Sequence, residues 1–158
     1  YVDALAQGYQ FVKGSRFTRG GGSHDLTPVR KWGNHALTRS VNAMWGVPFS
    51  DLCYGYIAFR ADVLSDLCPT ATGFEIETEM CVHAVKAHLR IAEVPTIELP
   101  RQFGESNLNA WRDGKRILTL LVRERLSVKP IVVDALDRRG VGAPNGHAAL
   151  SASTAVQL

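Results

Sequence analysis

Residues 75–95 read EIETEMCVHAVKAHLRIAEVP and contain the alternation that decides the fold class. Across residues 75–89, apolar side chains recur at the spacing of an amphipathic helix. Residues 90–94 have strand character, and Pro95 ends the strand. The helix is expected to turn the following residues toward a core: Ile76, Met80, Val82, Ala84 and Val85. A helix that leads directly into a strand is typical of α/β proteins.

The same alternation extends along the chain in both directions. Strand-like residues 11–12 lead into a glycine-rich loop at residues 20–22, whose backbone freedom allows close approach to a ligand. Apolar spacing predicts a helix over residues 28–44, with Thr27 as N-cap and proline at the first helical position. Residues 54–59 predict a short buried strand. A last amphipathic helix is expected over residues 109–126, with one broad apolar side made of Trp111, Ile117, Leu118, Leu121 and Val122.

Composition limits the chain to one ordinary globular domain. It has 158 residues, of which 46% are hydrophobic and 21% charged, so a sizeable core is possible and wholesale disorder is excluded. No apolar run approaches the ~18–20 residues that a membrane span needs. The first residue is Tyr1, which suggests a fragment or a processed product. Three cysteines without CxxC spacing favour free thiols in a reducing compartment, and hence a cytoplasmic location.

The charges are unevenly distributed along the sequence. Residues 1–50 carry six Lys or Arg against two Asp, residues 51–100 carry three against eight acids, and residues 101–126 carry six against three. Folding two basic segments around an acidic one favours a localised anion site, whereas a nucleic-acid partner would suit a uniformly basic face. Residues 127–158 contain no aromatic residue and are rich in Ala, Gly and Ser, which predicts a low-complexity tail or linker, although residues 131–133 could add a short strand.

Three arginines are candidates for anion binding. Arg16 precedes the glycine run, and Arg30 lies in the first turns of the helix predicted over residues 28–44. A cation is poorly placed at a helix N-terminus unless a bound anion resolves the conflict. Arg101 begins a loop, RQFGESNL, that could close over an anionic ligand. Solvated surface arginines and a plain loop with an N-cap are the alternatives.

Acidic residues recur at positions 75, 77 and 79. In a helix, Glu77 is separated from Glu75 and Glu79, which lie one turn apart. We expect Glu75 and Glu77 to lie on a solvated helix face. The chain has no DxD motif and no histidines at metal-ligand spacing, so we assign no metal site to it. It also lacks recognisable nucleophile, GxGxxG and Walker motifs.

A series of short motifs occurs in a fixed order along residues 1–126. They are VKGSRF at residues 12–17, GGGS at 20–23, RKWGN at 30–34, DLCYGY at 51–56, GFEIETEM at 73–80, EVP at 93–95, RQFGESNL at 101–108 and RDG at 112–114. Together they resemble the second half of a family 2 glycosyltransferase of the dolichyl-phosphate mannose synthase-like branch. Residues 1–126 would then be the C-terminal portion of the glycosyltransferase domain.

The resemblance implies a GT-A fold and an inverting transfer of a sugar from a nucleotide sugar to a polyprenyl or dolichyl phosphate. It also implies a divalent metal, Mg²⁺ or Mn²⁺, whose DxD ligands belong to an N-terminal half that is missing here. By the same resemblance, Arg16, Arg30 and Asn34 match positions that bind the acceptor phosphate, although relatives can carry a small hydroxyl residue in place of Asn34. Arg101 matches a position that contacts the donor diphosphate. Asp51 and Glu79 match acidic positions near the sugar.

Alternative functions stay open. A sugar hydroxyl could replace the lipid phosphate as acceptor, and a carboxylate such as Asp51 or Glu79 would then have to act as base. A non-catalytic phosphate- or nucleic-acid-binding module is a third possibility. A lipid acceptor implies peripheral contact with the cytoplasmic face of a membrane, and the helix over residues 109–126 could lie in that interface or pack into the core. We expect the chain alone to be inactive.

Overall fold

A computed structural model describes residues 1–100, 102 and 109–127, and it confirms the α/β class. The elements in chain order are α1 (Val2–Ala6), β1 (Phe11–Ser15), β2 (Gly22–Ser23), α2 (Pro28–Trp45), β3 (Ile57–Phe59), the 3-10 turn η1 (Ala61–Val63), α3 (Leu64–Leu67), α4 (Ile76–Lys86), β4 (Ile91–Pro95), β5 (Ile97–Glu98) and α5 (Ala110–Leu126).

Strand β1 is the centre of a three-stranded sheet with the order β3-β1-β4. It pairs with β3 in antiparallel register, Phe11 opposite Phe59, and with β4 in parallel register, Phe11 opposite Ile91. All five residues of β1 are buried, as expected for a strand covered on both faces. Strands β2 and β5 form a separate two-stranded parallel sheet. Arg16 directly follows β1, and its side chain contacts Glu98 of β5, so it links the two sheets.

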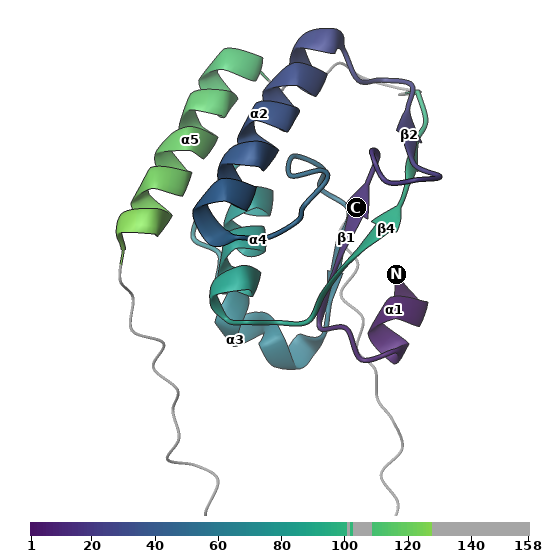
Figure 1. Cartoon of the computed structure of the whole chain (residues 1–158), viewed down its shortest axis with the longest axis vertical. Helices are drawn as coiled ribbons and strands as arrows, with labels where there is room; N and C mark the ends of the chain where they lie inside the picture. Colours follow the sequence, from purple (N-terminus) through teal and green to yellow (C-terminus); the bar gives the residue numbers. More distant parts are fainter. Residues whose placement is uncertain (101, 103–108, 128–158) are drawn as a thin grey trace, which may run out of the picture.

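Helices α2, α4 and α5 lie together on one side of the three-stranded sheet, and the short α1 lies on the other side (Figure 1). The hydrophobic core occupies the space between the sheet and these three helices, and it includes Phe11, Val41, Leu52, Met80, Val82, Ile117 and Leu121. The expected start of α2 is confirmed, because the Thr27 hydroxyl accepts a hydrogen bond from the Arg30 amide and Pro28 stands in the first turn. Asn109 caps α5 in the same way.

Two expectations need correction. The strand expected over residues 54–59 is shorter, since the Tyr54 carbonyl accepts a hydrogen bond from the buried Lys13 Nζ at 2.6 Å and only Ile57–Phe59 pair with β1. On α5, Ile117 and Leu121 are buried as expected, but Trp111 is 87% exposed, Leu118 48% and Val122 46%. The buried side of α5 is completed by Leu120 and by two acids.

Some sequence-based predictions fall outside the described residues. These are the role of Arg101, the short strand at residues 131–133 and all but the first residue of the tail or linker predicted over residues 127–158. Within the described part of the chain, no helix is both long enough and apolar enough to cross a bilayer.

Candidate functional site

A buried ion pair lies at the end of β1. The Arg16 guanidinium donates through Nε to one Asp51 carboxylate oxygen at 2.8 Å and through Nη2 to the other at 3.0 Å. The Arg16 backbone amide and the Asn34 amide group also donate to Asp51, at 3.1 and 2.9 Å. Asp51 is fully buried, and the loop that carries it is held by Glu93 of β4, whose carboxylate accepts from the amide of Ser50. Asp51 therefore fixes the orientation of the Arg16 guanidinium.

Further contacts hold Arg16 from other directions. Its Nη1 donates to Glu98 at 3.2 Å, and its guanidinium carbon lies 4.7 Å from the centre of the Tyr54 ring. Burial disfavours the charged form of Arg16, but the hydrogen bonds to Asp51 and Glu98 outweigh burial and raise its pKa above the ordinary arginine value. The guanidinium is thus a permanently charged and rigidly held group.

A cavity of about 960 Å³ opens beside this ion pair, between α2, α4, α5 and the segment leading into β3. Arg16 and Asn34 line it, and so does Arg30 from the first turn of α2. Most of the remaining wall is apolar and includes Val29, Leu37, Ile57, Phe74, Met80 and Ile117. The structure thus brings together the three residues that the resemblance assigned to phosphate binding, in one amphipathic cavity.

The charges of the cavity wall are mixed, since Asp25, Glu77, Glu98 and Asp113 line it together with Arg16, Arg30 and Lys115. The Glu98 carboxylate accepts from Arg16, and the Asp113 carboxylate accepts from the Asn109 amide at 2.8 Å. Arg30 of α2 and Lys115 of α5 contribute cations from two neighbouring helices. The N-terminal ends of both helices lie at the same end of the pair (Figure 1), and helix N-termini favour anions. The two cations and the two helix N-termini favour an anionic group at this end of the cavity, against the charge of Asp25.

Glu77 lies in the cavity wall, which corrects the expectation of a solvated helix face. Burial raises the pKa of the Glu77 carboxyl, although Lys13 and Arg16 act in the opposite direction. A side chain at Gly55 would approach within 2.5 Å of Glu77 Oε1, so the glycine makes room for this carboxylate. Glu75 is also partly buried, with its Oε1 4.0 Å from Arg116 Nε.

Glu79 lies away from the cavity wall, in a second polar cluster between α4 and α5. Its carboxylate accepts from the Thr70 amide and hydroxyl at 2.8 Å, from the Ala71 amide at 2.7 Å and from Arg123 at 3.3 Å. The structure therefore separates Glu79 from Asp51, the other predicted acidic site residue.

The same cluster offers the one grouping of potential metal ligands found among the described residues: Glu79, His83 and Glu124, with ligand atoms within 4.8 Å of one another. The two carboxylates already accept hydrogen bonds from protein donors. Lys86 Nζ donates to the Glu124 carboxylate at 3.0 Å, and His83 Nδ1 contacts the Leu67 carbonyl. A cation would have to displace the charges of Lys86 and Arg123, so this cluster fits a buried ion network better than a metal site.

Sequence reasoning did not find Lys13, Glu77 or Glu98 as site residues. Lys13 is fully buried in β1 and electrostatically linked to Glu77. A lysine directly after the strand-like residues 11–12 is the signal that could have marked it, since a lysine buried by extension of that strand needs polar partners. Glu98 carries no comparable signal, because its contact with Arg16 joins residues 82 positions apart.

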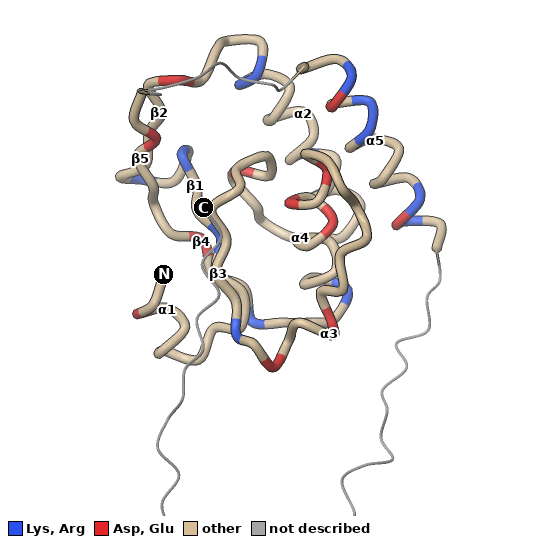
Figure 2. The backbone as a smooth tube through the Cα atoms, turned by 180° about the vertical axis from the view of Figure 1, so that it is seen from behind, with Lys and Arg blue, Asp and Glu red and all other residues tan. Residues whose placement is uncertain are grey.

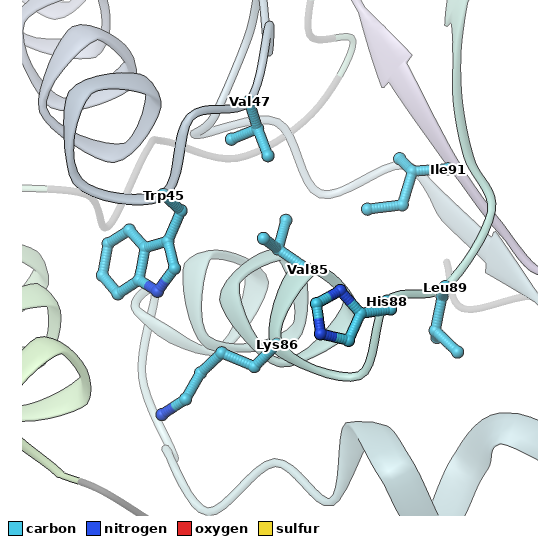
Figure 3. Close-up of a pocket in the computed structure, with 7 residues that line it drawn as sticks. All are labelled: Trp45, Val47, Val85, Lys86, His88, Leu89 and Ile91. Atoms are coloured by element: carbon cyan, nitrogen blue, oxygen red, sulfur yellow. The ribbon is translucent and has the colours of Figure 1, made fainter.

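A second hollow, of about 550 Å³, lies between the end of α2, the end of α4 and the start of β4 (Figure 3). Its wall is mostly apolar, with Trp45, Val47 and Ile91 around it, and the Lys86 amine is bound to Glu124. It contains none of the predicted site residues. The larger cavity is therefore the candidate functional site.

These features define an α/β domain whose rigid arginine–carboxylate pair borders an amphipathic cavity. No protein-family model matches the chain. Curated relatives do match it. Among them are glycosyltransferase AglJ of Haloferax volcanii, 35% identical over 82% of this chain and 43% of the relative; a dolichyl-phosphate hexose transferase of the same organism, 29% identical over 80% and 55%; and an undecaprenyl-phosphate mannosyltransferase of Micrococcus luteus, 29% identical over 69% and 46%.

The chain is thus homologous to glycosyltransferases over most of its own length, which confirms the resemblance seen in its ordered motifs. It spans about half the length of the curated relatives that it matches.

Proposed function

We propose that the chain is the acceptor-side part of a GT-A glycosyltransferase that moves a sugar from a nucleotide sugar to a polyprenyl or dolichyl phosphate. The observation that carries the proposal is the cavity of about 960 Å³, because its apolar wall and its arginines match the two halves of a lipid phosphate. Two of the relatives are named for polyprenyl-phosphate substrates, which supports the same class of acceptor.

The chemistry suits these side chains. A phosphate monoester is ionised near neutral pH, so its oxygen needs no strong base before it attacks the anomeric carbon. The new carbon–oxygen bond forms opposite the bond to the nucleotide diphosphate, which breaks and releases the diphosphate with inversion at that carbon. Arg16 and Arg30 would hold the attacking phosphate, and Arg101 would contact the diphosphate. The rate acceleration would then come from positioning the phosphate and from compensating the negative charges of the two reactants.

The proposal gives Asp51 a positioning role. Both of its carboxylate oxygens accept hydrogen bonds from Arg16, and Asp51 does not line the cavity, so it would orient Arg16 and would not act as a base. A divalent metal is expected for the whole enzyme, with ligands outside this chain, since the Glu79–His83–Glu124 cluster is occupied by protein cations. The metal would stabilise the departing diphosphate.

A second candidate function is transfer to a sugar hydroxyl. The observation in its favour is Glu77, a carboxyl in the cavity wall whose burial raises its pKa, as a general base requires. This candidate predicts that Glu77→Gln abolishes transfer, whereas the lipid-phosphate proposal predicts that the variant keeps most of it.

The direct test compares two arginines of α2 in the longer protein. Arg30 lines the cavity, whereas Arg39 is exposed elsewhere on the same helix. Arg30→Ala is expected to slow transfer to polyprenyl phosphate about 100-fold through loss of a charge-assisted contact, and Arg39→Ala is expected to leave the rate unchanged. Equal rates for the two variants would contradict the proposed acceptor site.

We place the protein at the cytoplasmic face of a membrane, in peripheral contact with the lipid that carries the acceptor. Free Cys53, Cys68 and Cys81 agree with a reducing compartment.

A further inference from the structure

Helix α5 carries an apolar stripe on its outer side. Trp111, Leu118, Val122 and Leu126 are 87%, 48%, 46% and 76% exposed. Their spacing of seven, four and four residues places them on one side of the helix, away from the buried side chains of Ile117 and Leu121. A row of four large exposed apolar residues on one helix is unusual for a surface that faces only water.

The exposed charges of α2 and α5 all have the same sign. On α2 and α5 they are Lys31, Arg39, Arg112, Lys115, Arg116, Arg123 and Arg125. The two acids of these helices, Asp113 and Glu124, are buried, and they account for the red bands on α5 in Figure 2. Helices α2 and α5 thus expose an apolar stripe and seven cations, and neither helix has an exposed carboxylate.

The stripe is continuous with the large cavity. Trp111 and Leu118 belong to the stripe and also line the cavity. Val29 of α2, which is largely exposed, lines the cavity as well. The cavity therefore reaches the surface at the apolar stripe, where Lys115 is also part of its wall.

From these observations we infer that the outer face of α2 and α5 docks on the surface of an anionic lipid bilayer. The stripe inserts at the boundary of headgroups and acyl chains, where tryptophan is favoured, and the cations contact anionic headgroups. A symmetric contact with a second copy would bring the cations of α5 against one another, and only Arg112, Arg116 and Arg123 of these have carboxylate partners among the described residues of their own chain, so like charges disfavour self-association through this face. The link between this face and a lipid acceptor in the cavity rests on the proposed function, whereas the docking itself does not.

The test is co-flotation of the 158-residue chain with phosphatidylcholine vesicles, with or without phosphatidylglycerol. Binding is expected only with the anionic lipid, with a blue shift of tryptophan fluorescence that Trp111→Phe reduces. Lys115→Glu combined with Arg125→Glu is expected to weaken partitioning at least about tenfold, from roughly 1 kcal/mol per basic residue.

A matched pair of variants distinguishes insertion of the stripe from nonspecific hydrophobic adsorption to the vesicles. Leu118→Ser should weaken flotation, whereas Leu64→Ser, at a similarly exposed leucine of α3, should not. Failure to float with anionic vesicles, equal effects of the two serine variants, or a dimer that Leu118→Ser dissociates would each overturn the inference. The vesicles contain no polyprenyl phosphate, so these outcomes are independent of the Arg30 transfer assay.

Discussion

Replacing Asp51 with alanine should be among the most destabilising single changes in the domain. The substitution removes a carboxylate that accepts four hydrogen bonds, two from the Arg16 guanidinium, one from the Arg16 amide and one from Asn34. The Arg16 side chain is only 5% exposed, so its charge would stay buried with Glu98 as its remaining ion-pair partner. Removing one partner of a buried ion pair costs about 3–5 kcal/mol, a large share of the roughly 5–15 kcal/mol that stabilises a domain.

The assay is urea denaturation followed by circular dichroism at neutral pH. The midpoint should fall strongly while the slope stays constant. Arg60 and Asp62 supply a matched control, because their bidentate contacts of 3.1 and 3.0 Å resemble those of the buried pair but both side chains are exposed. Asp62→Ala should leave the midpoint unchanged. If the two alanine variants unfold at the same urea concentration, the reasoning about the buried pair is refuted.

Two further predictions concern carboxylates of α4. Burial raises the pKa of Glu77 in the folded state, so its contribution to stability is complete at low pH and is lost as pH rises through the folded pKa. Glu77→Gln should therefore be more stable than the parent at neutral pH and equal to it below about pH 4. A difference in urea midpoint between variant and parent that stays constant across that pH range would argue against this prediction. Glu79 is the opposite case, because burial is outweighed by hydrogen bonds from Ala71 and Thr70 that lower its pKa, and its contribution is lost as pH falls through the folded pKa. Glu79→Gln should lose about 1.5–3 kcal/mol of unfolding free energy at neutral pH, and a variant as stable as the parent there would disprove this role.

Local sequence signals predicted the three long helices, α2, α4 and α5, because their ends are set by nearby residues, but they did not predict the short α1 and α3. Thr27 and Pro28 fix the start of α2, and Asn109 caps α5, without help from distant parts of the chain. The ordered motifs identified the relatives, and Arg16, Arg30 and Asn34 do share one cavity.

Packing between elements determines which neighbours the side chains of α4 and α5 contact, and local sequence signals could not predict this. Glu77 and Glu79 are two positions apart, about 200° around a helix, so they point to different neighbours. Only the docking of α4 determines that Glu77 meets the cavity and Glu79 meets α5. Likewise, the apolar residues of α5 suit either of two faces, and contact with the core buries Ile117 while leaving Trp111 in solvent.

Binding of a short-chain polyprenyl phosphate, compared with the matching polyprenol by titration calorimetry, tests the role of the cavity most directly. Because Arg30 and Arg16 can make charge-assisted contacts, we expect the phosphate to bind much more tightly than the alcohol. Arg30→Ala should remove most of this preference, whereas Arg39→Ala should keep it. Equal affinity of the parent chain for phosphate and alcohol would contradict the assignment of these arginines to a lipid phosphate.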